Sequence, residues 1–125
     1  ISDVFTMSMA ELAYISEGLG TVSKIFECAP QGGKNENARI HPTQKPVALY
    51  KWLLTNYAKQ GDKILDTHVG SASSLIACHD MGFDAVGFEL YPDYYKASKR
   101  RLDDFMAQPR IETLHTNEYR QVAIQ

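Results

Sequence analysis

The chain has 125 residues, of which 44% are hydrophobic and 22% are charged, and its formal net charge is −2. These values are typical of one small globular domain, and they argue against a strong nucleic-acid binder, whose phosphate contacts need clustered Lys and Arg. No apolar run is long enough to cross a bilayer and no signal peptide opens the chain, so we expect a cytoplasmic protein without membrane contact.

The two cysteines, Cys28 and Cys78, have no further Cys or His at metal-ligand spacing, apart from His79 beside the second. We therefore expect no metal site, and we interpret both cysteines as small buried hydrophobes in a reducing compartment. Because Ile1 is not an initiator residue, we also expect that other residues precede it in the native protein.

The first third of the chain predicts one strand and one loop. Residues 1–14 are hard to assign, and the glycines of residues 18–20 indicate a turn. Residues 21–28 are rich in β-branched side chains, which favours a strand that Pro30 would end. Residues 31–39 are polar and glycine-bearing, as is typical of a loop.

Three helices are expected in the rest of the chain. The first begins after the two prolines of residues 41–46, with apolar residues at spacings of three and four up to Tyr57. The second covers residues 75–81, with Ser73 or Ser74 as its N-cap and Gly82 as its end. The third begins at Pro92 and ends before Pro109, and its inward face would carry Tyr95, Ser98, Leu102 and Phe105.

Short strands are expected between these helices, at residues 63–66 and 84–90, each with an acid near its carboxyl end. The tail, residues 111–125, would be a last strand or partly disordered. Strands that alternate with helices predict an α/β fold, in which a mostly parallel sheet carries helices on both faces. A sheet this small would be incomplete, and its exposed edges would allow a homodimer.

The strongest chemical pattern is the loop of small residues after Asp66, followed by Glu89 at the end of the next strand. In open α/β sheets such a loop lets a nucleoside approach the backbone, and a carboxylate about 20 residues further on accepts hydrogen bonds from the ribose hydroxyls. A full dinucleotide glycine pattern is missing, which argues against NAD. Spacing alone leaves open whether this is a nucleoside site or a plain turn between a strand and a helix.

The hexapeptide His41–Pro46 (HPTQKP) narrows these alternatives. Together with the helix after it, the Leu-Asp-Thr that ends at Thr67, and Gly70-Ser71, it resembles the S-adenosylmethionine-dependent DNA amino-methyltransferases of bacteria and phages. These enzymes modify the exocyclic amino group of adenine or cytosine. The arrangement is similar to the permuted class, in which the catalytic motif precedes the cofactor motifs, and the resemblance runs from about Val22 to about Leu102.

The resemblance implies a methyltransferase fold of the Rossmann type and a role for each matching residue. Thr43, Gln44, Lys45 and Pro46 would line the methionine end of S-adenosylmethionine. Asp66 would lie near the methionine amino group, and Glu89 would hold the ribose. The other implied cofactor residues are the loop residues Thr67, His68, Gly70 and Ser71, with Phe88 or Leu90 beside the adenine.

Two departures from the family pattern bear on activity. The family's Gly-Ser-Gly is here Gly70-Ser71-Ala72. If the third position needs a positive φ, an alanine there costs about 1 kcal/mol and cofactor binding would be weaker. The family's catalytic motif, Asp/Asn/Ser-Pro-Pro-Tyr/Phe, grips a flipped-out base, but this sequence has no Pro-Pro pair. We therefore predict no catalytic residue in this chain, and we expect the motif upstream.

The prediction is thus a single partial methyltransferase domain over residues 1–125. Residues 1–40 would be a preceding strand and loop, residues 41–108 the cofactor-binding core, and residues 109–125 a tail. The intact enzyme would bind DNA. The main alternative is a truncated or decayed remnant that only binds the cofactor or a partner. The basic run Lys99-Arg100-Arg101 is interpreted as the solvated face of a helix.

Overall fold

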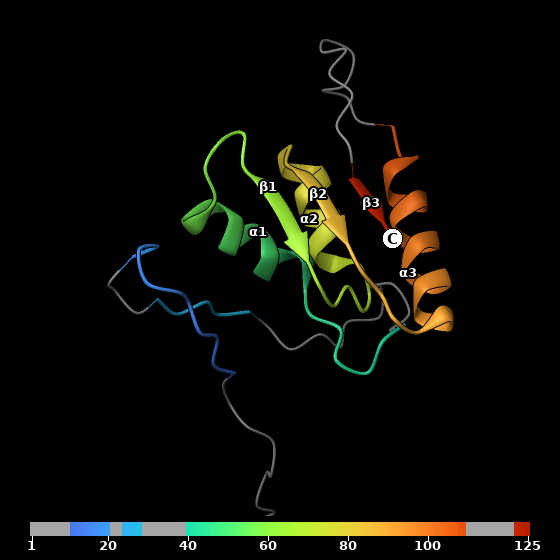
Figure 1. Cartoon of the computed structure of the whole chain (residues 1–125), viewed down its shortest axis with the longest axis horizontal. Coiled ribbons are helices and arrows are strands. Elements are labelled where there is room, and N and C mark those ends of the chain that lie inside the picture. Colours follow the sequence, from blue (N-terminus) through green and yellow to red (C-terminus); the bar gives the residue numbers. More distant parts are fainter. Residues whose placement is uncertain (1–10, 21–23, 29–39, 110–121) are drawn as a thin grey trace, which may run out of the picture.

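The structure is a computed structural model, and it describes residues 11–20, 24–28, 40–109 and 122–125. Six elements follow one another along the chain (Figure 1). In order, they are α1 (Val47–Tyr57), β1 (Lys63–Asp66), α2 (Ser73–Met81), β2 (Asp84–Gly87), α3 (Pro92–Met106) and β3 (Val122–Ile124). The alternation of helices and strands that the sequence predicts from residue 41 onward is confirmed.

The three strands form one parallel sheet in the order β1-β2-β3. Leu65 pairs with Val86, and Val86 pairs with Ala123. The predicted α/β class with a parallel sheet is therefore confirmed. The tail contributes the third strand. The prediction of a last strand in the tail is therefore confirmed for residues 122–124.

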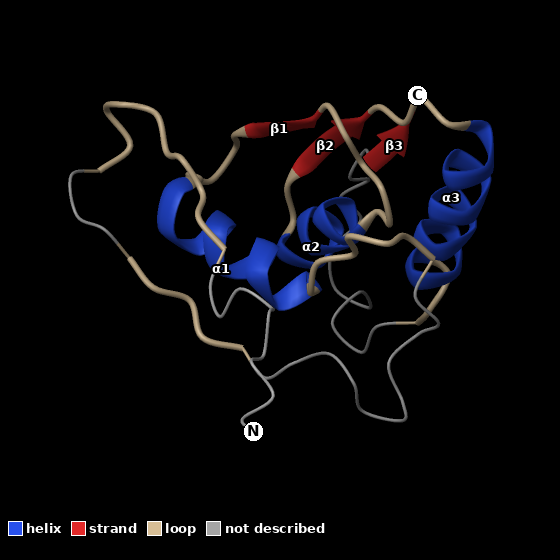
Figure 2. Cartoon of the chain, turned by 90° about the horizontal axis from the view of Figure 1, so that it is seen from below, coloured by secondary structure: helices blue, strands red, loops and turns tan. Residues whose placement is uncertain are grey.

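The described helices lie on one side of this sheet, whereas the sequence predicts helices on both faces. Figure 2 shows α1 and α2 under the strands, with α3 beside α2 at the β3 end. The strand order explains this arrangement. Crossovers between parallel strands are right-handed, and both crossovers here step in the same direction along the sheet, so their helices must lie on the same face.

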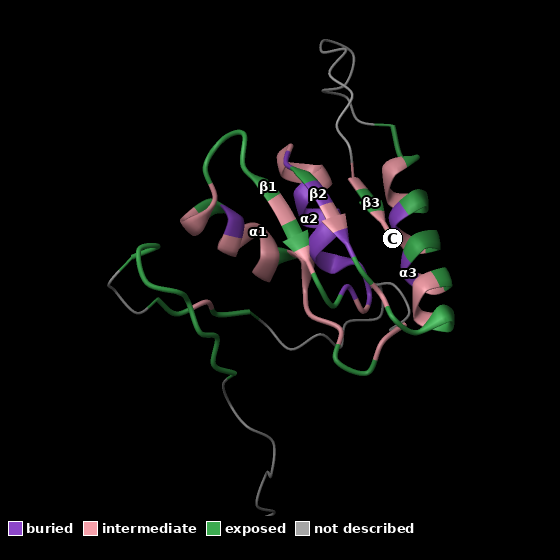
Figure 3. Ribbon diagram, viewed as in Figure 1, coloured by how far each residue is buried: buried purple, intermediate pink, exposed green. Residues whose placement is uncertain are grey.

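The core lies between the helices and the sheet, and α2 is its centre (Figure 3). All residues of α2 from Ser73 to Cys78 are buried. Leu75 of α2 and Leu102 of α3 are 0% and 2% exposed. The opposite face of the sheet is open among the described residues, and Leu65 on that face is 60% exposed.

Two of the helix boundaries follow from residues with special backbone preferences. α2 ends at Gly82, whose φ of 84° is left-handed, and the amides of Gly82 and Phe83 both donate to the carbonyl of Cys78. α3 begins at Pro92, which lacks the amide that would have no partner in the first turn. Both boundaries are those that the sequence predicts.

Three local predictions were wrong. Residues 24–28 are not in a strand, and the rest of that predicted strand, residues 21–23, lies outside the described residues. β2 ends at Gly87 rather than at residue 90, because the next bond, from the amide of Val69 to the carbonyl of Phe88, comes from the loop after β1 and not from a strand. α2 begins at Ser73, with Ala72 at its N-cap and no side-chain cap.

No helix in the described part of the chain is long and apolar enough to cross a membrane. The same residues contain no group of three or more His, Cys, Asp or Glu that could hold a metal ion. Cys78 is buried as predicted, whereas Cys28 is exposed.

Candidate functional site

The loops that follow β1 and β2 lie together, because parallel strands place their carboxyl ends at the same edge of a sheet. The amide of Phe88 donates to the carbonyl of Asp66 at 2.9 Å, and the amide of Val69 donates to the carbonyl of Phe88 at 3.0 Å. These bonds extend the contact between β1 and β2 past the end of both strands. Asp66 and Glu89, which are far apart in the sequence, therefore belong to one site.

Glu89 connects the two loops through its carboxylate. Its Oε2 accepts a hydrogen bond from the amide of Gly70 at 2.9 Å, and its Oε1 accepts one from the amide of Tyr91 at 3.0 Å. Hydrogen bonds to an ionised group are stronger than those between neutral groups, so they hold the side chain in one orientation. Each carboxylate oxygen has a second lone pair, which leaves both able to accept a bond from a ligand.

Asp66 is held in a similar way at the end of β1. Its Oδ1 accepts the amide of His68 at 2.9 Å, and its Oδ2 accepts the hydroxyl of Ser74. The Ser74 hydroxyl, predicted as a cap of α2, thus bonds to this carboxylate instead. Burial, with the negative charge of Asp66 as the second cause, raises the pKa of Tyr50 on α1. The carboxylate therefore lies close enough to α1 for its charge to disfavour ionisation of the Tyr50 hydroxyl.

The loop between Asp66 and α2 is a tight turn with two left-handed residues. Gly70 has a φ of 56°, and Ala72 has a φ of 66° and a ψ of 16°. A left-handed alanine brings its Cβ close to the following carbonyl, at a cost of about 1–2 kcal/mol. The third position of Gly70-Ser71-Ala72 does require a positive φ, and the strain that the sequence predicts for Ala72 is present.

The hexapeptide His41–Pro46 runs past the same edge of the sheet before α1 begins (Figure 1). Within it, the amide of Gln44 donates to the carbonyl of His41 at 3.1 Å, and Thr43 bonds to the His41 ring. Lys45 forms an ion pair with Glu11 at 2.6 Å, and Pro46 immediately precedes α1. Thr43 and Gln44 thus bond to His41 and Ile40, and Lys45 bonds to Glu11, rather than to the loop after β1.

His41 itself joins the hexapeptide to the rest of the site. A Cβ built on Gly70 would lie 3.6 Å from its ring, and the ring centroids of His41 and Tyr94 are 4.5 Å apart. The imidazole therefore lies between the loop after β1 and the first turn of α3. Neither His41 nor Tyr94 was predicted as a site residue. The position of His41 in the hexapeptide was the signal available in the sequence.

The predicted residues beside the carboxylates are open to solvent. Thr67 and His68 are exposed and lie side by side, with 2.9 Å between the threonine hydroxyl and the histidine Nδ1. Phe88 is 47% exposed and Leu90 is 84% exposed. Ser71, in contrast, is only 5% exposed and belongs to the core side of the loop.

A comparison with known families identifies this combination of hexapeptide, loop and carboxylate. The profile of the DNA methylase family matches residues 6–100, which contain all three. The chain belongs to the DNA methylase family. The resemblance inferred from the sequence is thereby confirmed.

Three individual relatives of this methylase chain agree with that result. It is 36% identical over 81 residues to the type II methyltransferase M.HpaI of Haemophilus parainfluenzae, a match that covers 65% of this chain and 26% of that protein. It is 38% identical over 63 residues to the DNA adenine methyltransferase YhdJ of Escherichia coli, covering 50% of this chain and 21% of YhdJ. It is 35% identical over 63 residues to the type II methyltransferase M2.DpnII of Streptococcus pneumoniae, covering 50% and 24%.

The methylase chain therefore spans between about a fifth and about a quarter of the length of these curated relatives. No solved structure gives a significant match to it.

One basic residue of the methylase chain, Arg101, forms hydrogen bonds to the loop between Asp66 and α2, which the sequence did not predict. The run of residues 99–101 is predicted to be a solvated helix face, and Lys99 and Arg100 are indeed exposed. Arg101 instead turns inward, and its guanidinium donates to the carbonyl of Ser71 at 2.7 Å and to the hydroxyl of Ser73 at 2.8 Å. Burial lowers the pKa of this guanidinium. The prediction was therefore wrong for Arg101.

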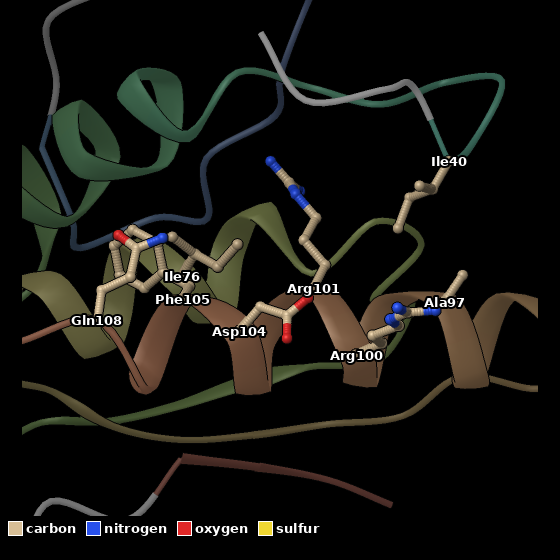
Figure 4. Close-up of a pocket in the computed structure, with 8 residues that line it drawn as sticks. All are labelled: Ile40, Ile76, Ala97, Arg100, Arg101, Asp104, Phe105 and Gln108. Carbon is tan, nitrogen blue, oxygen red and sulfur yellow. The ribbon is translucent and has the colours of Figure 1, made fainter.

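A pocket lies along α3, on the side that faces α2 (Figure 4). The carboxylates of Asp66 and Glu89 are not among the residues that line it. Its lining residues are Ile40, Ile76, Ala97, Arg100, Arg101, Asp104, Phe105 and Gln108.

Proposed function

We propose that this chain forms the S-adenosylmethionine-binding part of a DNA methyltransferase that acts on the exocyclic amino group of adenine or cytosine. Membership of the DNA methylase family supports methyl transfer to DNA in general. The observation that carries the cofactor assignment is the carboxylate of Glu89, fixed by the amides of Gly70 and Tyr91 beside the loop after β1.

The residues at the strand ends fit an adenosine. A ribose offers two hydroxyl donors, and Glu89 keeps one lone pair on each oxygen after its two amide bonds. Phe88 and Leu90 flank Glu89 in the sequence and expose apolar surface, which suits either of them to contact an adenine ring. The positive φ of Gly70 allows the tight turn over which a nucleoside would approach the backbone.

The methionine end would lie toward α1. Asp66 keeps acceptor capacity for an ammonium group after its bonds to His68 and Ser74. Thr43, Gln44, Lys45 and Pro46 would line this end, as would Thr67, His68 and Ser71 next to the turn. Residues 41–108 would thus be the cofactor-binding core, residues 1–40 a preceding segment and residues 109–125 a tail.

When bound, S-adenosylmethionine supplies a methyl group on a positively charged sulfur, which an amine can attack directly. The described residues would bind and orient this group, and such positioning is a large part of what accelerates a displacement reaction. We propose no catalytic residue in this chain. The base-binding motif and the DNA contacts would come from other parts of the intact enzyme. A homodimer through the sheet edges stays a prediction.

A second candidate function is a methylase remnant that binds the cofactor or a partner without transferring a methyl group. The strained left-handed backbone of Ala72, at a position where the family pattern has glycine, is the observation in its favour.

Isothermal titration of the chain with S-adenosylmethionine tests the proposal. We expect micromolar binding that Glu89→Gln weakens at least about 10-fold, because a buried or oriented charge-assisted bond contributes that much or more. Asp103→Asn removes the same charge from the exposed pair with Lys99, and it should leave the affinity unchanged. A folded chain that binds no S-adenosylmethionine, or one that binds equally well without the Glu89 carboxylate, would refute the assignment.

A further inference from the structure

The loop between Asp66 and α2 is anchored from a third element, the helix α3. Arg101 lies in the middle of α3, and its side chain extends away from that helix into the space between Ile76 and Ile40 (Figure 4). Its Nη1 donates to the carbonyl of Ser71 at 2.7 Å and to the hydroxyl of Ser73 at 2.8 Å. One nitrogen thus holds the residue before Ala72 and the residue after it.

Ala72 is the strained point that these two bonds enclose. Its φ is 66° and its side chain is 0% exposed. The neighbouring hydroxyls of Ser71 and Ser73 lie 3.0 Å apart, and both residues are almost fully buried. A left-handed non-glycine residue persists only where its surroundings hold it in place. The guanidinium of Arg101 provides bonds on both sides of that residue.

A cation at this position is unfavourable in two respects. The N-terminus of a helix carries a partial positive charge, and Arg101 lies against the N-terminus of α2, where Ser73 is the first helical residue. Burial also lowers the pKa of the guanidinium. These costs are offset by the two short hydrogen bonds that Nη1 donates, one to a carbonyl and one to a hydroxyl.

We infer that Arg101 is a positioning residue for cofactor binding. It holds the turn at residues 70–73 in the one conformation that presents the amide of Gly70 to Glu89. Glu89 fixes the turn at its start and Arg101 fixes it at its end. This inference rests on the proposed function, because the turn is the loop that would lie beneath S-adenosylmethionine.

Arg101→Met is the variant that tests the inference, since methionine keeps an apolar stem but donates no hydrogen bond. Arg100→Met removes the same charge from the neighbouring exposed residue and is the matched control. The first measurement needs no ligand: amide hydrogen exchange at Gly70 and Ala72, whose amides bond to Glu89 and Val69. We expect exchange at both amides to accelerate about 10-fold in Arg101→Met, and to stay unchanged in Arg100→Met.

The second measurement is the dissociation constant for S-adenosylmethionine. It should rise about 10-fold in Arg101→Met, less in Arg101→Lys, and not at all in Arg100→Met. Adding Ala72→Gly to Arg101→Met removes the backbone strain at residue 72. Because the turn then no longer needs the guanidinium to keep its conformation, most of the lost affinity should return. A merely structural arginine would lower the melting temperature without this rescue.

The two proposals can fail separately. If the wild-type chain does not bind S-adenosylmethionine, the proposed function fails, and exchange at Gly70 and Ala72 still decides whether Arg101 anchors the turn. If the wild-type chain binds and a folded Arg101→Met variant matches it in both affinity and exchange, the role of Arg101 is overturned. Arg101→Lys serves the same comparison should the methionine variant fail to fold.

Discussion

The side chain of Val69 packs directly against the backbone of Gly87. A Cβ built on Gly87 would lie 2.2 Å from Cγ2 of Val69 and 3.0 Å from Cδ1 of Leu75. Gly87 is the last residue of β2 and is buried. The loop after β1 can therefore cross the end of β2 only because this residue has no side chain.

Gly87→Ala should destabilise the chain by about 1–3 kcal/mol, the usual cost of forcing an extra carbon into a packed core. Urea unfolding followed by circular dichroism measures this change. Gly61→Ala is a comparison from an open turn, where nothing lies within 4 Å of the added carbon but φ is 89°, so its cost of about 1–2 kcal/mol reflects backbone strain alone. Substituting Gly87 without a loss of stability would contradict the packing described.

Ala72→Gly and Ala77→Gly delete the same methyl group from two fully buried positions, both 0% exposed. Ala77 lies inside α2, so its replacement should cost about 2 kcal/mol, from lost helix propensity and lost burial. At Ala72 the relief of left-handed strain offsets the lost methyl, and stability should change by less than about 1 kcal/mol. Equal losses in the two unfolding curves would show that Ala72 is not strained.

Burial, with the charge of Asp66 as the second cause, raises the pKa of Cys78 from 9.0 to about 11. Because the folded-state pKa lies above the unfolded one, the contribution to stability is fully present below pH 9 and is lost as the pH rises toward 11. The urea midpoint should therefore fall across this range, and the fall should be shallower in Cys78→Ala. A midpoint that stays constant from pH 9 to 11 would contradict the raised pKa.

The two thiols should also react at different rates with a disulfide reagent at about pH 8, because the reacting group is a thiolate that the reagent can reach. Cys28 is exposed and Cys78 is 1% exposed. We expect one thiol to react within the mixing time and the second to react only as the chain opens. Cys28→Ser should remove the fast phase, and a fast phase that persists in this variant would contradict the burial of Cys78.

Much of the central fold could be predicted from residues whose backbone preferences are strong. Pro92 and Gly82 set helix boundaries where the sequence predicts them, and the apolar spacing of residues 47–57 predicts α1. The strand predicted at residues 21–28 does not form over residues 24–28. A strand needs a neighbour with which to pair, and β-propensity alone does not provide one.

The residues that form the site could be predicted from the sequence better than the contacts between them. Asp66, Gly70 and Glu89 are brought together as the spacing predicts. Arg101 was missed because three consecutive basic residues suggest a solvated face. Its position three residues after Ser98 and four before Phe105 places it beside the inward stripe of α3, and that spacing was the signal in the sequence.

The most direct test of the account is a nitrogen–proton correlation spectrum of the isotope-labelled chain, titrated with S-adenosylmethionine. The amides of Gly70 and Tyr91 donate to the carboxylate that would hold the ribose, so their signals should move in step with saturation. The amide of Gly61, in the turn before β1, should stay in place. Shifts that leave Gly70 and Tyr91 unmoved while other signals respond would contradict a cofactor site at the ends of β1 and β2.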